Sequence, residues 1–162
     1  MKTGKKIIIL FLLIMTLCSC TQKESQTGIT DTAEITQTES EEDNMRLKIE
    51  ANGKNLIANF EDNSSADAFI QKLEEGPLTV ELEDYANFEK VGELPFSLER
   101  NDTQLTTQPG DVILYQGNMI TIYYDTNSWN FTKLAKIPDV NKDDLLEVLG
   151  NGDVTVTFSL TE

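Results

Sequence analysis

The stretch GDVILYQGNMITIYYDTNSWNFTKLAKI, residues 110–137, decides the fold. β-Branched and aromatic residues gather at 112–115, 119–124 and 131–137, so we expect three strands there. A short turn joins the first two. Residues 125–130 are polar and carry Trp129, the only tryptophan, in what we expect to be a loop. The function of the protein depends on what this loop faces.

Outside this stretch, alternating apolar and polar residues predict further short strands, at 45–50, 56–60, 78–82 and 153–160, with an extended piece at 94–96. Helical spacing of apolar residues predicts a helix that starts near residues 63–65 and ends at Gly76-Pro77, and a short helix at 143–149. Segments 84–92 and 99–109 are expected to be irregular. About eight strands and two helices predict a mainly β domain, a closed or nearly closed barrel capped by the two helices.

The first residues have the features of a lipoprotein signal peptide. A lysine-rich start precedes an apolar run at 7–17, which is too short for an ordinary transmembrane helix. The run ends in Leu17-Cys18-Ser19-Cys20, which resembles a bacterial lipobox with Cys20 as the lipid-modified residue. An uncleaved membrane anchor is the alternative. We therefore expect a signal peptide at 1–19, and an extracytoplasmic protein anchored to the bacterial cell membrane by lipid on Cys20.

Residues 20–44 are expected to form the lipidated N-terminus and a disordered acidic linker, and residues 45–162 one domain. The chain carries a net charge of −15, so nucleic acid is an unsuitable partner. It contains no histidine, which excludes His-based triads and imidazole general bases. With Cys20 lipidated, no thiol site remains. The acidic residues match no calcium-loop pattern, and we expect neither a metal nor a cofactor.

A series of short sequence motifs along residues 45–160 bears on the family to which the domain is similar. In chain order they are Asp62-Asn63, Ala66, Asp84-Tyr85, Lys90-Val91-Gly92, Leu94-Pro95, Pro109-Gly110-Asp111, Leu114-Tyr115, Gly117-Asn118, Tyr124, Ser128-Trp129, Leu134 and Ile137. In this order the domain resembles the bacterial cyclophilin-like domain family. The resemblance implies a cyclophilin-type β-barrel in a protein that is not a true cyclophilin.

The resemblance also implies a candidate cleft. True cyclophilins isomerise X-Pro bonds with an arginine beside an apolar cleft, together with glutamine, aromatic, tryptophan and histidine side chains. Arg100 and Trp129 lie in the corresponding parts of this chain, whereas the histidine and the Gln-Gly-Gly and Gln-Phe-Phe words are missing. Arg100 is the candidate catalytic residue, and the candidate cleft residues are Phe96, Arg100, Tyr115, Tyr124, Trp129 and Phe131.

Each candidate has a structural alternative. Tyr115 and Tyr124 fit the barrel core or rim better than a cleft, because alternate residues of a strand point inward. Arg100 fits a surface ion pair with Glu99, Asp102 or another acid. For Trp129 an exposed, cleft-facing position and a buried one are both open.

Two functions follow. The preferred one is a non-catalytic module that binds a peptide or a small ligand, because the cyclophilin active-site pattern is largely missing. The alternative is a divergent peptidyl-prolyl isomerase with weak activity that uses Arg100, Phe96 and Trp129. The sequence leaves the ligand and the oligomeric state open.

The lipobox interpretation predicts a defined chemical modification. Mass measurement of the protein extracted from membranes should find a chain that begins at Cys20 and carries a diacylglyceryl group. An intact, unmodified N-terminus would contradict the prediction.

Overall fold

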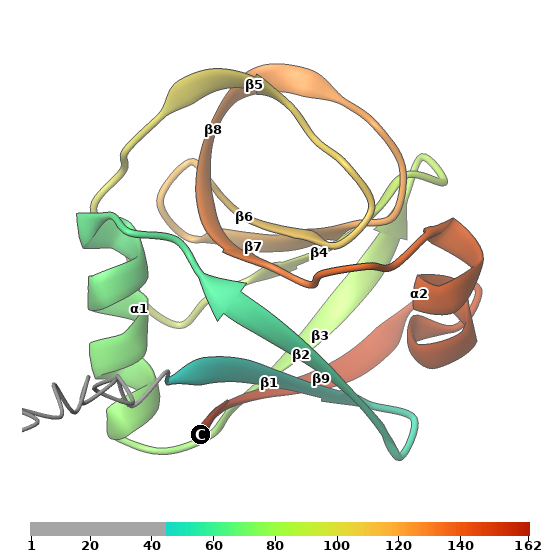
Figure 1. Ribbon diagram of the computed structural model, residues 1–162, viewed down its shortest axis with the longest axis horizontal. Coiled ribbons are helices and arrows are strands. Elements are labelled where there is room, and N and C mark those ends of the chain that lie inside the picture. The colour runs from blue at the N-terminus through green and yellow to red at the C-terminus, as the bar shows by residue number, and fades with distance from the viewer. Residues whose placement is uncertain (1–44) are drawn as a thin grey trace, which may run out of the picture. The chain divides into compact units, whose positions relative to one another are not determined.

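The computed structural model describes residues 45–162. This part of the chain forms nine strands and two helices (Figure 1). The strands are β1 (Arg46–Ala51), β2 (Lys54–Phe60), β3 (Leu78–Tyr85), β4 (Glu89–Glu93), β5 (Thr103–Thr106), β6 (Asp111–Tyr115), β7 (Met119–Tyr123), β8 (Ser128–Lys136) and β9 (Val154–Thr161). The helices are α1 (Ser64–Glu74) and α2 (Lys142–Leu149).

Eight of the strands form a nearly closed antiparallel ring in the order β2-β1-β9-β3-β4-β7-β6-β8. The ring closes through a short pairing of β2 with β8, at Asn59 with Lys136 and Phe60 with Ala135. β5 lies outside the ring and pairs with the first half of β8. The predicted mainly β, barrel-like fold is confirmed.

β9, the last strand, lies between β1 and β3 and pairs with both along most of its length. Val154, Val156 and Phe158 point from it into the core, as the alternation of its sequence predicts. The ring therefore cannot close without the final residues of the described chain.

The two helices lie on opposite sides of the strands (Figure 1). The side chain of Asn63 caps α1, and Asn141 caps α2 in a capping box with Asp144. Both helices bury apolar side chains in the core that the strands surround, among them Phe69 of α1 and Leu145 of α2. No helix within residues 45–162 has the length and apolar character needed to cross a membrane.

Two segments that were expected to be irregular contain strands, so those expectations were wrong. The segment 84–92 is a regular hairpin between β3 and β4, because Ala86 and Asn87 adopt positive φ and form a tight turn. The polar segment 99–109 contains β5, whose threonines favour a strand although its faces are largely exposed. The extended piece expected at 94–96 pairs with no strand and does not count among the nine.

Gly92 marks the tightest packing between β3 and β4. A β-carbon at this position would lie 2.6 Å from Leu82 Cδ2 and 2.8 Å from Val80 Cγ1, and would also clash with the Glu81 carbonyl. The backbone has little room to move away, because Gly92 pairs with Ile120 of β7 and the preceding residues of β4 pair with both β3 and β7.

Gly92→Ala should therefore lower the free energy of unfolding by about 2–3 kcal/mol, the cost of overpacking a core. Gly53→Ala is the control, because nothing lies within 4 Å of its missing β-carbon and only the positive φ opposes the substitution, at about 1 kcal/mol. Urea denaturation measures both. Equal effects of the two substitutions would contradict the packing argument.

Candidate functional site

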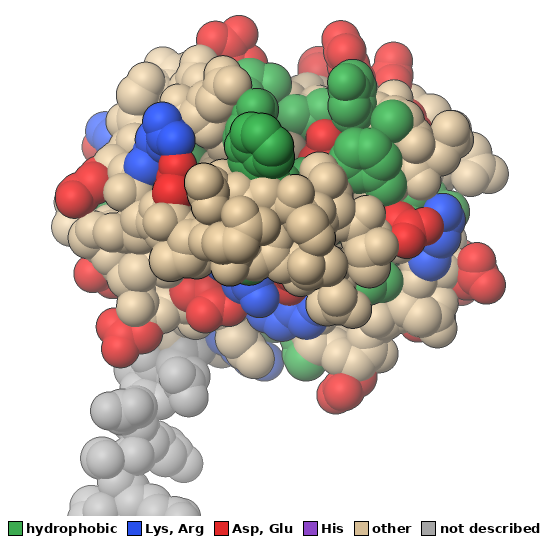
Figure 2. Space-filling model, turned by 90° about the horizontal axis from the view of Figure 1, so that it is seen from above, with side chains coloured by type: hydrophobic (Ala, Val, Ile, Leu, Met, Phe, Trp, Pro, Cys, Tyr) green, Lys and Arg blue, Asp and Glu red, His purple; other side chains and the backbone are tan. Residues whose placement is uncertain are grey.

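A cleft of about 610 Å³ lies on the outer face of the barrel wall, beside β5 and the start of β8. Figure 2 shows hydrophobic side chains gathered around a hollow, with an acidic side chain between them. The residues that line the cleft come mainly from β4, β6, β7 and β8: Tyr85, Phe88, Glu89, Val91, Tyr115, Gln116, Met119, Tyr123, Asn127, Trp129 and Phe131.

Strand alternation explains why this wall has two apolar faces. In β6, Val112 and Leu114 point into the main core, whereas Ile113 belongs to a second, smaller apolar cluster. Tyr123 and Phe131 complete that second cluster, with rings 5.6 Å apart. Two members of this second cluster, Tyr123 and Phe131, line the cleft, which is therefore separate from the barrel core.

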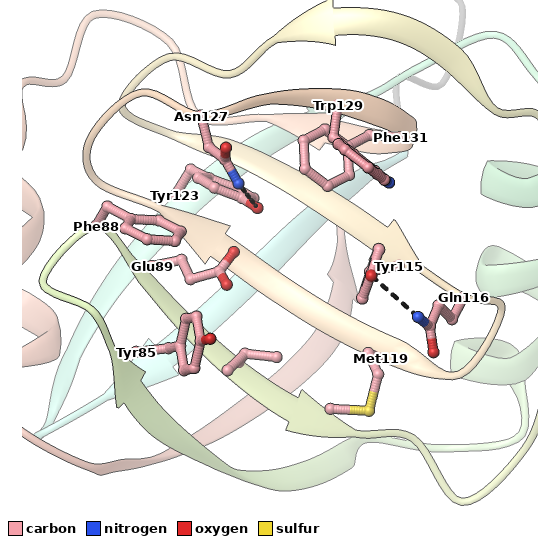
Figure 3. Close-up of a pocket in the computed structure, with 11 residues that line it drawn as sticks. Tyr85, Phe88, Glu89, Tyr115, Gln116, Met119, Tyr123, Asn127, Trp129 and Phe131 are labelled. Carbon is pink, nitrogen blue, oxygen red and sulfur yellow. Dashed lines mark hydrogen bonds between the residues drawn. The ribbon is translucent and has the colours of Figure 1, made fainter.

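Aromatic side chains form the walls of the cleft (Figure 3). Phe88 stacks on Tyr123 with ring centres 6.0 Å apart, and Tyr85 meets Phe88 edge-on at 5.8 Å. Tyr115 meets Phe131 edge-on at 6.1 Å. The contacts between neighbouring rings make a preformed apolar surface, which is typical of ligand sites.

Trp129 lies in strand β8, opposite Leu105 of β5, so the expected loop placement was wrong. β8 begins at Ser128 because β5 offers it a partner strand. Trp129 nevertheless remains 60 % exposed and lines the cleft. A large exposed indole beside an apolar hollow is an unusual and informative feature.

Arg100 does not line the aromatic cleft. It borders an adjoining hollow together with Tyr115, Gln116, Trp129 and Asn130. Its guanidinium forms an ion pair with Asp102. That contact holds the pKa of Asp102 below its usual value.

Two other candidates lie away from the cleft. Tyr124 is buried on the core side of the wall, where its hydroxyl donates to Asp84 Oδ1 at 2.9 Å. Phe96 packs against the main core, with Lys72 Nζ 5.7 Å from its ring centre. Of the six candidate residues, the structure thus brings Tyr115, Trp129 and Phe131 together in the aromatic cleft.

Glu89 was not among the candidates, although it is the only charged residue that lines the cleft. It lies in β4, within the segment expected to be irregular, and is only 8 % exposed. Burial raises the pKa of Glu89, and the nearby Tyr123 hydroxyl acts in the opposite direction. The sequence Glu89-Lys90-Val91 was the available signal. In a strand, neighbouring side chains point to opposite faces, so Glu89 and Lys90 lie on opposite sides of the wall.

Cys20 lies outside the described residues. Within residues 45–162, no three potential metal-ligating side chains come together in a group that could hold a metal ion.

Comparison with known proteins gives one result. A family model described as a cyclophilin-like family matches residues 49–159. No curated protein matches the chain.

Glu89 gives a prediction about stability and pH. Its pKa is raised in the folded state, so the folded protein holds the proton to higher pH than the unfolded chain does. Stability must then fall as the pH rises above the ordinary value of about 4.5. Glu89→Gln removes this loss, so the variant should gain stability relative to the wild type between pH 4 and pH 7.5.

Urea denaturation at several pH values measures the difference. Glu93→Gln, at an exposed position on the same strand, is the control and should follow the wild type at every pH. A constant difference between wild type and Glu89→Gln across this range would contradict the prediction.

Proposed function

The chain belongs to the cyclophilin-like family, and on that premise we propose that its domain is a non-catalytic module that binds a peptide segment or a small ligand in the aromatic cleft. The supporting observation is the cleft itself, a 610 Å³ hollow with aromatic walls. Two of the aromatic residues that line this cleft are largely exposed to solvent: Trp129 at 60 % and Tyr85 at 58 %. Exposed aromatic residues at an apolar hollow are favourable anchors for a partner, since covering them removes a large apolar area from water.

The proposal includes a location. The basic start, the short apolar run and Leu17-Cys18-Ser19-Cys20 support a lipoprotein held at the outer side of the bacterial cell membrane by lipid on Cys20. The expected signal peptide at 1–19 and the expected acidic linker at 20–44 lie outside the described residues.

Weak prolyl isomerase activity is the second candidate. One observation favours it: Arg100 and Trp129 border the same hollow. An arginine can assist rotation of an X-Pro bond by donating a hydrogen bond to the prolyl nitrogen as amide resonance is lost. The ion pair with Asp102 uses two of the five N–H groups of the guanidinium, so the others stay available to a substrate. Binding without chemistry is preferred because the histidine and the Gln-Gly-Gly and Gln-Phe-Phe words of active cyclophilins are missing.

One experiment separates the two functions. The full chain in detergent solution is mixed with the neutral peptide Ac-Ala-Phe-Pro-Ala-NH2, and NMR follows both line broadening and cis–trans exchange of the peptide. We expect broadening without faster exchange. Trp129→Ala should weaken binding at least about tenfold, as loss of an aromatic anchor does.

Met45→Ala is the matched control, because Met45 is also an exposed large apolar residue but does not line the cleft. It should bind as the wild type does. Exchange that is accelerated by the wild type and lost in Arg100→Ala would establish the isomerase instead. Unchanged binding in Trp129→Ala would remove the cleft from the proposal.

A further inference from the structure

The carboxylate of Glu89 has the Tyr123 hydroxyl beside it, but no lysine or arginine among the residues that line the cleft compensates its charge. Its side chain points into the cleft from β4 (Figure 3). Its Oε2 atom is buried and accepts no hydrogen bond from any residue in the described part of the chain. Buried carboxylate oxygens are costly when unpaired, so nearly all are paired with a donor or a cation.

No positive charge compensates Glu89 from within the cleft. None of the residues that line it is a lysine or an arginine. Lys90, its neighbour in sequence, points to the other face of the wall, where its Nζ contacts Asp84 and the Gly152 carbonyl. Arg100, at the adjoining hollow, is paired with Asp102. Where Glu89 is ionised, the formal charge of the lining is therefore negative and lies on this one carboxylate.

The walls around this carboxylate also favour a cation. Six aromatic side chains line the cleft, and the faces of aromatic rings attract ammonium groups at distances of about 6 Å. The same rings can pack against methylene groups next to the charge. An anionic ligand would meet repulsion from Glu89 and from the ring faces.

We propose that the cleft recognises a protonated amine carried on an apolar chain, which donates a hydrogen bond to Glu89 while its methylene groups pack between the aromatic walls. This inference rests on the proposed binding function and adds the chemical class of the ligand. A lysine side chain of a peptide and a free alkylamine share this chemistry.

The test uses Trp129 as the reporter, since it is the only tryptophan in the chain and lines the cleft. The full chain in neutral detergent is titrated at pH 7.5 and low salt with Ac-Ala-Phe-Lys-Ala-NH2 and with Ac-Ala-Phe-Nle-Ala-NH2. Norleucine has the carbon chain of lysine with a hydrogen in place of the terminal ammonium group, so the two peptides differ only by that group. We expect the lysine peptide to bind at least tenfold more tightly.

Two variants locate the effect. Glu89→Gln should abolish the preference for lysine by weakening only the lysine peptide. Glu93→Gln removes the same charge from an exposed position of the same strand, outside the cleft, and should keep the preference. Equal loss in both variants would overturn the role of Glu89.

The two peptides distinguish failure of this inference from failure of the proposed function. Equal binding of the two peptides overturns the amine preference but leaves peptide binding intact. If neither peptide changes the emission of Trp129, both proposals fall. n-Butylammonium chloride distinguishes the sources: competition at concentrations similar to those of the lysine peptide supports a free amine, and a much weaker effect supports a peptide side chain.

Discussion

The structure depends on the way in which β4 separates two neighbouring opposite charges. Lys90 is fully buried, and its Nζ lies 2.5 Å from Asp84 Oδ2. The two residues are cross-strand partners of β3 and β4. Partial burial raises the pKa of Asp84, but the hydrogen bonds from Lys90 and Tyr124 outweigh it and keep the pKa low. A slip of one residue would move Glu89 into the core and Lys90 into the cleft, so this ion pair fixes the register on which the site depends.

The strands that carry the cleft, mainly β4, β6, β7 and β8, have an apolar region on each face. Their inner face belongs to the core that closes the ring, and their outer face carries the cluster of Ile113, Tyr123 and Phe131. β8 serves both regions. Its second half pairs with β6 and β2 in the ring, while its first half pairs with β5 and brings Trp129 to the cleft. The cleft can therefore accept a ligand without disturbing the barrel core.

Much of this architecture follows from the sequence, because alternation and helical spacing depend on local order alone. When both faces of a strand are apolar, however, the sequence does not tell which face packs against the core. Tyr123 and Tyr124 illustrate this: Tyr124 was the candidate, yet Tyr123 lines the cleft and Tyr124 binds Asp84 in the interior. Glu89 was missed because its burial depends on the pairing of β4 with β7, a strand that is distant in sequence. Trp129 and Phe131 could be found from the sequence because large aromatic residues in or next to a polar segment are candidates for a binding site, whichever face of the strand they occupy.

The charges at the two adjoining hollows bear on the choice between binding and catalysis. Isomerisation of an X-Pro bond needs a donor near the prolyl nitrogen, and the donor here, Arg100, borders the adjoining hollow and does not line the aromatic cleft. The aromatic cleft offers an acceptor instead, the unpaired oxygen of Glu89. An acceptor surrounded by aromatic faces favours a cationic ligand and gives no assistance to an amide that loses its resonance. The arrangement of charge therefore fits recognition of an amine better than rotation of a peptide bond.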